Sequence, residues 1–195
     1  MNTTNQKQEN TISNSWEARY NRIDASQLPD NVKELIDQQW MLVTAGNKNS
    51  HNTMTASWGA IGYIWERPSA FIFIRDTRYT YQFLQREEYF TLSLFTEQYR
   101  GALRVCGTKS GRDADKVKEA GLTPIDTPDG LMSFREARMI IECRKMFEQE
   151  LDYANLTEYY KDEILEKSYN NETAKHQLFI SEITNIWLKE YSQEK

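Results

Sequence analysis

Short runs of apolar, aromatic and Thr-rich residues recur along this chain, and residues typical of turns separate them. Residues 40–45 are almost continuously apolar and stop at Gly46, where a Gly- and Asn-rich segment begins. Runs of this length and composition, bounded by turn residues, predict β-strands rather than helices. The expected strands cover residues 40–45, 53–65, 70–74, 89–95, 133–151 (as one strand or two) and 177–190.

Short helical patterns lie between the expected strands. Thr80 and Asp113 stand where two of these helices begin and can cap them, and Gly121 can end the second. Because a closed sheet leaves no strand edge exposed, this mixture predicts a mainly β fold, a β-barrel with inserted helices. The expected helices cover residues 29–38, 80–87, 100–105, 113–120 and 155–168, the last of them acidic with an apolar side formed by Leu156, Tyr159, Tyr160, Ile164 and Leu165.

Length and composition exclude several other classes of protein. A chain of 195 residues fits one domain, expected over residues 15–195, and the Asn-, Thr- and Gln-rich residues 1–14 predict a disordered tail. No apolar run approaches the roughly 20 residues that cross a bilayer, and the N-terminus lacks the pattern of a signal peptide, so we expect a cytoplasmic protein without membrane contact. The net charge of -5 argues against a nucleic-acid-binding surface. Two dispersed cysteines and two histidines predict no metal site.

The run from Asn52 to Trp58 is rich in small residues that carry hydroxyl groups. On a strand, Thr53, Thr55 and Ser57 share one face. Such a face can accept a flat polar ring, with the hydroxyls and main-chain N–H groups as hydrogen-bond partners. An ordinary strand with a solvent-facing Thr/Ser side explains the same spacing, so both interpretations stay open.

Two arginines, Arg75 and Arg78, precede the helix expected at Thr80. The N-terminus of a helix presents unpaired N–H groups and a positive dipole end, which suit a phosphate. The arginines can add charge-assisted hydrogen bonds to the same anion. The alternative is a solvated loop in which they pair with Asp76 or Glu87.

A third polar segment contains Lys109, Ser110 and Arg112. Its glycine spacing differs from that of a Walker phosphate loop, so it predicts either a second phosphate contact or simply the start of the next helix. Cys106 predicts a buried small residue rather than a nucleophile. His176, ahead of the last expected strand, predicts a structural residue or, as the weaker alternative, a catalytic polar neighbour.

Five segments, in this order, resemble the flavin reductase-like family, which includes the flavoredoxins. The resemblance implies an FMN-binding split barrel, a Greek-key antiparallel barrel, that forms a homodimer with FMN near the subunit interface. The resemblance, not the spacing, names FMN as the cofactor. It extends over residues 30–190 and rests on residues 40–46, 52–59, 78–80, 109–113 and 176–183.

The resemblance also implies roles for single residues. His176 stands where family members have a histidine, and Ser181 replaces a glycine of the family, which narrows the space expected beside the ring. The implied cofactor contacts are Asn52, Thr53, Met54, Thr55, Ala56, Ser57 and Trp58 for the ring and ribityl chain, and Arg75, Arg78, Tyr79, Thr80, Lys109 and Ser110 for the phosphate.

The implied function is that of a flavin reductase, an enzyme that passes hydride from NAD(P)H to FMN and then electrons to an acceptor or a redox partner protein. The chain has no dinucleotide-binding glycine motif, so we expect the nicotinamide to bind transiently over the flavin. Two alternatives stay open. One is a flavoredoxin-type FMN electron carrier without significant NAD(P)H turnover, and the other is a non-enzymatic split-barrel module without FMN.

Overall fold

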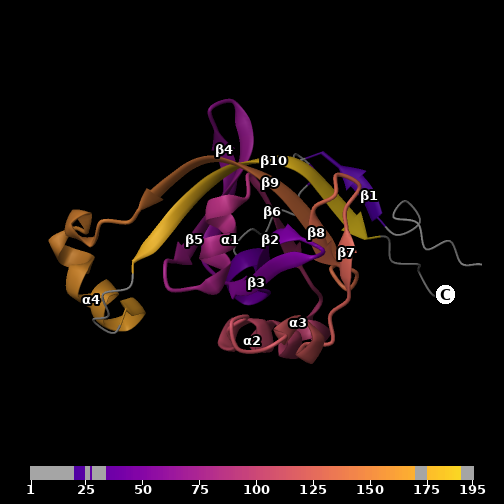
Figure 1. Cartoon of the computed structure of the whole chain (residues 1–195). Coiled ribbons are helices and arrows are strands. Elements are labelled where there is room, and N and C mark those ends of the chain that lie inside the picture. Colours follow the sequence, from indigo (N-terminus) through magenta and orange to yellow (C-terminus); the bar gives the residue numbers. More distant parts are fainter. Residues whose placement is uncertain (1–19, 25–26, 28–33, 170–174, 190–195) are drawn as a thin grey trace, which may run out of the picture.

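One antiparallel sheet curls around the core of the protein, and helices lie against it (Figure 1). The computed structural model describes residues 20–24, 27, 34–169 and 175–189, so the tail expected at residues 1–14 lies outside the described residues. The strands of the sheet follow the order β3-β2-β6-β9-β10-β5-β4, with β1 paired to β10, and β7 and β8 form a separate hairpin. The mainly β fold expected from the sequence is confirmed.

The elements agree with most of the expected strands and helices, although the first part of the helix expected at residues 29–38 lies outside the described residues. Among the described residues, no helix is both long and apolar enough to cross a membrane. In chain order the elements are β1 (Tyr20–Ile23), η3 (Glu34–Gln38), β2 (Met41–Asn47), β3 (Ser50–Ala56), β4 (Gly59–Ile64), β5 (Arg67–Arg75), α1 (Tyr79–Arg86), β6 (Tyr89–Leu94), η4 (Glu97–Tyr99), α2 (Arg100–Thr108), α3 (Lys116–Glu119), β7 (Pro124–Asp126), β8 (Met132–Phe134), β9 (Met139–Glu150), η5 (Tyr153–Asn155), α4 (Glu158–Tyr169) and β10 (His176–Lys189).

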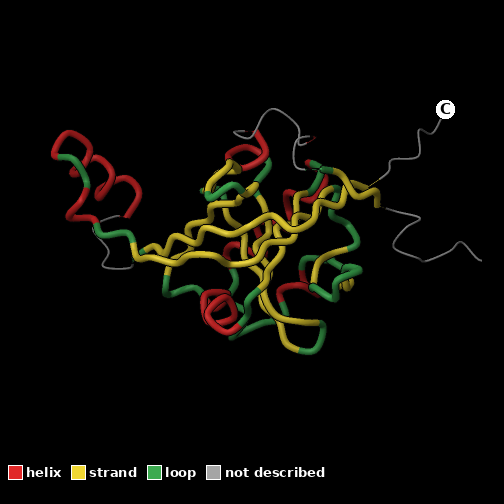
Figure 2. The backbone as a smooth tube through the Cα atoms, turned by 90° about the horizontal axis from the view of Figure 1, so that it is seen from above, coloured by secondary structure: helices red, strands yellow, loops and turns green. Residues whose placement is uncertain are grey.

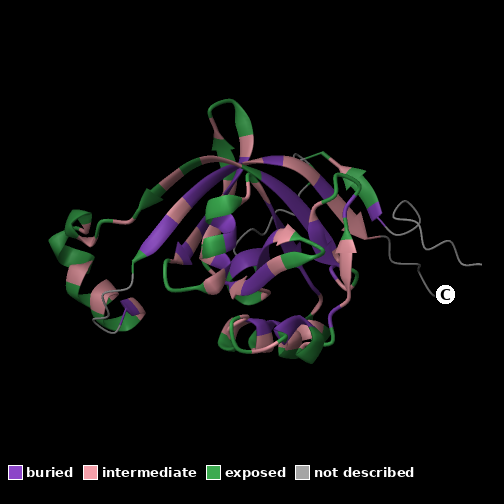
Figure 3. Cartoon of the chain, viewed as in Figure 1, coloured by how far each residue is buried: buried purple, intermediate pink, exposed green. Residues whose placement is uncertain are grey.

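Two apolar clusters lie on the two faces of the sheet, one with α1 and the other with α2 and α3. β9 contributes to both, because Met139 and Ile141 belong to the first cluster while Ile140 belongs to the second. Figure 3 shows the buried parts of the strands at the centre of the molecule. Burial on both faces of the sheet explains why Met139, Ile140 and Ile141 form a continuous apolar run.

The connection between β3 and β4 is where the two ends of the strand order meet. β3 pairs with β2 at one end and β4 pairs with β5 at the other, although only Ser57 and Trp58 separate β3 from β4 in the chain. Gly59 permits this change of edge, because a Cβ there would lie 2.7 Å from the carbonyl oxygen of Phe71. The single strand expected over residues 53–65 is therefore wrong. We call Ser57 and Trp58 the seam.

The first helix begins one residue earlier than expected. α1 starts at Tyr79, with Arg78 in the N-cap position and no side chain capping it. Thr80, the expected cap, instead accepts a hydrogen bond from Asn52 of β3. The hydroxyl of Thr80 therefore holds the helix against the sheet, and the expectation that it caps the helix is wrong.

The expected cap of the fourth helix is also displaced. Asp115, not Asp113, caps α3 by accepting a hydrogen bond from the N–H of Lys118. The chain from Gly111 to Ala114 forms turns, so the helix starts later than its sequence pattern suggests. The expectation that Gly121 follows the end of this helix is confirmed by its φ of 67°.

Beyond the barrel, β9 and β10 continue as a two-stranded arm that carries α4 (Figures 1 and 2). Tyr159 is 83% exposed and Tyr160 is 52% exposed, so the apolar side expected for residues 155–168 does not pack against the barrel. Among the described residues of α4, the buried one is Tyr169 at its end. The helix is therefore confirmed but its burial is not, because it sits at the tip of the arm.

Candidate functional site

Cationic side chains from several parts of the chain converge on one cavity beside the start of α1. Arg75 ends β5, Arg78 precedes α1, Lys109 and Arg112 follow α2, and Lys116 begins α3. The cavity has a volume of about 220 Å³, and none of the described residues that line it has a carboxylate side chain. We call these five residues and their cavity the cationic notch. Its concentration of positive charge suits an anionic ligand.

The N-terminus of α1 opens into the cationic notch. Tyr79 and Thr80 both line the cavity, and the first N–H groups of a helix have no partner within it. The positive end of the helix dipole adds to the charge of the notch. The Asn52 side-chain amide donates to Oγ1 of Thr80 over 2.7 Å and so fixes this end of the helix to β3. These donors fit a phosphate group.

The two arginines of the notch are held by main-chain oxygens. Nη1 of Arg78 donates to the carbonyl oxygen of Gly107 over 3.0 Å, and Arg78 makes no ion pair within the part of the chain that the structure describes. The alternative in which Arg78 pairs with a neighbouring acid is therefore wrong. Nη2 of Arg75 donates to the carbonyl oxygen of Ser168 over 2.9 Å, which connects β5 to the end of α4.

The segment after α2 contributes to the notch as expected. Lys109 and Ser110 both line the cavity, and Lys109 also forms an ion pair with Glu119. Oγ of Ser110 accepts a hydrogen bond from the N–H of Arg112 over 3.2 Å. The guanidinium of Arg112 lies 4.7 Å from the ring centroid of Tyr79, which places it over the aromatic face.

Sequence reasoning missed Lys116 as a residue of the notch. Its Nζ lies 3.3 Å from the carbonyl oxygens of Cys106 and Lys109 and donates to both, and the residue is only 4% exposed. Burial lowers the pKa of Lys116, and the charge of Arg78 lowers it further. The sequence indicates only that Lys116 follows Asp115, the residue that caps α3. It does not indicate which face of α3 is buried.

Cys106 lines the same cavity from α2 and is 1% exposed. Burial raises the pKa of its thiol to about 11, although the charge of Lys116 opposes this shift. The thiolate, which is the nucleophilic form, is therefore scarce at neutral pH. The interpretation of Cys106 as a buried small residue is confirmed.

A second cavity adjoins the notch at the seam and has a volume of about 290 Å³. The two cavities share Met54, Arg75 and Arg78. Trp58 stacks on His176 at the edge of this second cavity, with ring centroids 4.9 Å apart and planes at 32°. We call this cavity the ring pocket. It is lined by Met54, Thr55, Ala56, Ser57, Trp58, Phe73, Arg75, Arg78 and His176.

Only part of the hydroxyl face expected for β3 lines the ring pocket. Thr53 is fully buried, and its Oγ1 lies 2.8 Å from Oγ1 of Thr44 within the β2–β3 pair. Thr55 lines the pocket, but its hydroxyl donates to the carbonyl oxygen of Leu103 in α2. The expected strip is wrong for these two threonines, because neighbouring elements take up their hydroxyls. Met54, from the opposite face, lines both cavities.

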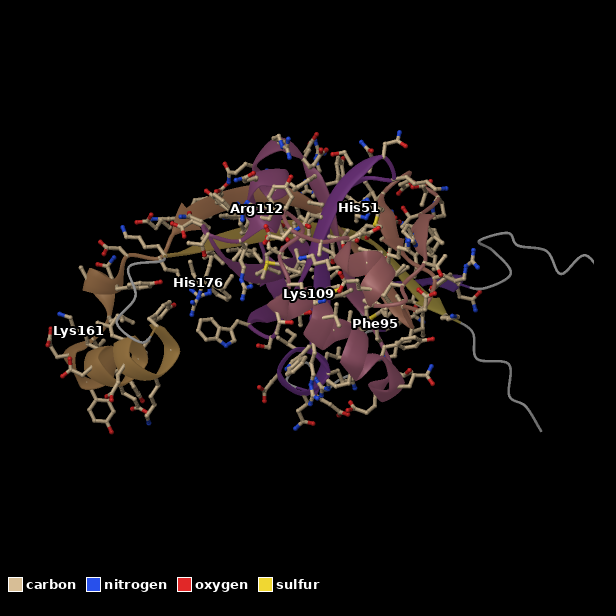
Figure 4. The ribbon with its side chains drawn as sticks, turned by 60° about the horizontal axis from the view of Figure 1, so that its bottom comes forward. His51, Phe95, Lys109, Arg112, Lys161 and His176 are labelled. Carbon is tan, nitrogen blue, oxygen red and sulfur yellow. The ribbon has the colours of Figure 1, made fainter. Side chains whose placement is uncertain are left out.

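His176 begins β10 opposite Arg75 and is 6% exposed. Its Nδ1 is buried and has no hydrogen-bond partner among the residues that the structure describes. Burial lowers the pKa of His176 to about 4, and the charges of Arg75 and Arg78 contribute, so the ring is neutral at physiological pH. Tyr169 packs edge-on against it with centroids 5.3 Å apart. Figure 4 shows His176 between the barrel and α4.

The ring pocket and the notch together form one elongated site, because they share three of their lining residues. One end carries the rings of Trp58, Phe73 and His176, and the other end is cationic. Such a site fits a planar molecule with an anionic tail. Of the residues expected to contact a cofactor, Asn52 and Thr53 line neither of these two cavities. Asn52 instead supports Thr80.

Comparison with known proteins gives a family and several relatives of the same fold. The family described as "Flavin reductase like domain" matches residues 34–195, whereas no curated protein matches. Flavoredoxin of Desulfovibrio vulgaris (Miyazaki F) is 24% identical over 77% of this chain and 69% of its own, with a TM-score of 0.58. An FMN-binding domain of a flavin reductases-like enzyme from Shewanella baltica is 16% identical over 87% and 76%, with a TM-score of 0.59. The NADH:FAD oxidoreductase SgcE6 of Streptomyces globisporus is 15% identical over 78% and 77%, with a TM-score of 0.57.

The curled antiparallel sheet and its structural neighbours identify the fold as an FMN-binding split barrel. This chain belongs to the flavin reductase-like family, because the family match covers most of its length. The resemblance inferred from the sequence is confirmed. Family and structural neighbours support a flavin as the ligand.

Lowering the pH should destabilise the protein through His176. The pKa of this ring falls from 6.5 to about 4 on folding, so between these values the unfolded chain binds more protons, and the free energy of unfolding falls as the pH drops. At about 1.36 kcal/mol for each pH unit, the loss reaches up to ~3 kcal/mol. NMR titration of the ring checks the shift directly, and a midpoint near 6.5 in the folded protein would contradict it. His176→Asn should flatten the same part of a urea-unfolding pH series.

Proposed function

We propose that this protein is an FMN-binding flavin reductase that takes hydride from NADH or NADPH and passes electrons to a small acceptor or a redox partner protein. The observation that carries the proposal is the elongated site, in which the ring pocket adjoins the cationic notch. When bound, the flavin supplies a ring that accepts hydride and releases electrons singly or in pairs. Structural neighbours described as an FMN-binding domain and as an NADH:FAD oxidoreductase support this reaction class.

The residues of the site fit FMN at both of its ends. Arg75, Arg78 and the start of α1 would hold the phosphate by charge-assisted hydrogen bonds. Met54 and Trp58 would contact the isoalloxazine ring. The unpartnered Nδ1 of His176 is an independent sign of a polar ligand atom, since a buried polar atom without a partner is costly.

The protein's own contribution is to orient the rings and exclude water. Trp58 is 42% exposed and marks the open side of the ring pocket, where a nicotinamide could approach from solvent. Because the pKa of His176 lies near 4, its ring is neutral and acts as an orienting neighbour, not as a proton donor, at neutral pH. Hydride transfer between stacked rings needs no further acid or base, so the proposal assigns none.

We also propose that the protein forms a homodimer. Tyr63 and Trp65, near the β4–β5 turn, are 71% and 55% exposed, and Trp65 packs edge-on against the half-exposed Phe147 of β9 with centroids 6.2 Å apart. Neighbouring exposed aromatic residues are typical of protein contact surfaces.

Light scattering should give twice the mass of the chain, and Phe147→Asp should give a monomer. Tyr159→Asp, on the distant α4, is the matched control, and a wild-type monomer would contradict the proposal.

Replacing Arg78 with Ala should weaken FMN binding by about 1.5–3 kcal/mol, the range for a hydrogen bond to a charged group. Riboflavin binding should change little, because riboflavin lacks the phosphate. Quenching of flavin fluorescence measures both affinities. Arg86→Ala is the control on the same helix, since Nε of Arg86 donates to the carbonyl oxygen of Gln82 and not to the notch. Equal weakening of both flavins by Arg78→Ala would refute the phosphate assignment.

Anaerobic mixing of the FMN-loaded protein with NADH or NADPH should bleach the flavin absorbance rapidly. Bleaching by either nucleotide supports the reductase and identifies the donor. If the protein holds FMN but neither nucleotide bleaches it, the electron carrier replaces the reductase as the better interpretation. A purified protein that binds no added FMN points to the non-enzymatic module.

A further inference from the structure

A separate cavity is formed by β6, β9, β10 and the turn that connects β7 to β8 (Figure 1). Its volume is about 350 Å³, within the usual range for small-molecule sites. It shares no residue with the notch or the ring pocket, so the flavin placement proposed above leaves it unused. We call it the acidic pocket. The described residues that line it are Tyr89, Asp129, Leu131, Glu142 and Thr184.

Glu142 is a carboxylate in the middle of a buried strand. Its neighbours on β9, Ile141 and Cys143, belong to the core, and Glu142 itself is 0% exposed. Oε1 of Glu142 has no hydrogen-bond partner in the part of the chain that the structure describes, and the next basic residue along β9, Arg144, pairs with Glu88 instead. A buried carboxylate oxygen without a partner is costly. The acidic pocket that this group lines is therefore the place for the missing partner.

A β-bulge places two polar residues of β10 opposite Glu142. The pairing of β9 with β10 shifts between Ile183 and Asn185, so that Thr184 is the extra residue. Nδ2 of Asn185 donates to Oε2 of Glu142 over 2.7 Å and to Oδ2 of Asp129 over 2.6 Å. The hydroxyl of Thr184 lines the pocket and donates to the main-chain oxygen of Glu142 over 3.3 Å, so its own oxygen can still accept a hydrogen bond. The bulge therefore gathers acceptor oxygens around one point.

The electrostatics of the acidic pocket favour a cation. Burial raises the pKa of Glu142. Hydrogen bonds from Thr127 and Asn185 lower this pKa, whereas the neighbouring Asp129 raises it. A cation placed between the two carboxylates would stabilise the ionised form of each. It would also supply the partner that the buried oxygen of Glu142 lacks.

The lining selects an organic cation rather than a metal ion. Among the described residues, no group of three or more His, Cys, Asp or Glu side chains is placed to hold a metal. A primary ammonium group has three N–H donors, and Glu142, Asp129 and Thr184 offer it three acceptors. Tyr89 and Leu131 form the rest of the wall and suit a hydrocarbon stem.

We propose that the acidic pocket binds a small primary alkylamine in its protonated form. The ammonium group lies between Glu142 and Asp129, and the hydrocarbon stem lies against Tyr89 and Leu131. The pocket shares no residue with the flavin site, so this binding goes beyond the proposed function and does not depend on it. A ligand there connects β9, β10 and the β7–β8 turn, and it stabilises the folded chain by binding to that state alone.

Amide NMR spectra of the full-length protein test the proposal. Butylammonium chloride is added near neutral pH, beside a sodium chloride series of equal ionic strength. The N–H signals of Leu131, Glu142 and Thr184 should shift until they saturate with butylammonium only. Methylammonium should bind about tenfold or more weakly, because it lacks the CH₂ groups of the stem. Shifts that fail to saturate, or that sodium chloride reproduces, overturn the proposal.

Substitutions of single carboxylates locate the bound cation. Glu142→Gln and Asp129→Asn each remove a charge with little change of shape, and each should weaken butylammonium binding about tenfold or more. Asp126→Asn on β7 is the matched control, because Asp126 pairs with Lys48 and does not line the pocket. It should bind within about threefold of the wild type, as expected for a screened surface charge. If Glu142→Gln does not fold, Asp129→Asn in its exposed turn carries the test. Wild-type affinity in the Asp129 variant overturns the proposal.

Two other cations separate the proposed ligand from its rivals. Tetramethylammonium has the charge but no N–H donor, so it should bind more weakly than butylammonium. Equal affinity for the two would mean attraction by charge alone. Calcium chloride that shifts the same N–H signals at lower concentration than butylammonium would make the pocket a metal site. Either result overturns the proposal.

Discussion

The site depends on the way in which β3 and β4 divide between the two ends of the sheet. Only the seam, Ser57 and Trp58, connects them, so the backbone there crosses from one edge to the other instead of continuing a ladder. Gly59 makes the crossing possible by letting β4 begin close to the carbonyl oxygen of Phe71. Had the strand run on beside β2, Trp58 would not reach His176, and the ring pocket would lack its aromatic wall.

The cationic notch places like charges close together in the protein without ligand. The main-chain carbonyl of Gly107 and those that hold Lys116 offset part of their repulsion, and burial of Lys116 adds to the cost. A bound anion removes this repulsion, and whatever binds the folded state alone also stabilises it. Binding of an anion in the notch would therefore gain free energy from the relief of this repulsion.

Local signals in the sequence were enough to predict much of the fold and part of the candidate site. The strands at 89–95 and 177–190 follow from composition and turn residues, and Arg78 and Tyr79 follow from a cluster that lies before one helix. The features that sequence reasoning missed depend on contacts between segments that are distant in the chain. The break within 53–65 is set by two different partner strands, and the burial of Lys116 is set by how α3 packs on α2. Neither leaves a periodic pattern in the chain.

The arm also has a mechanical consequence. Arg75 holds the carbonyl of Ser168, and Tyr169 packs against both Trp58 and His176, so the end of α4 rests directly on the wall of the ring pocket. A tilt of the arm at its root would therefore shift Tyr169 relative to the Trp58–His176 stack, which couples the position of the arm to the shape of the ring pocket.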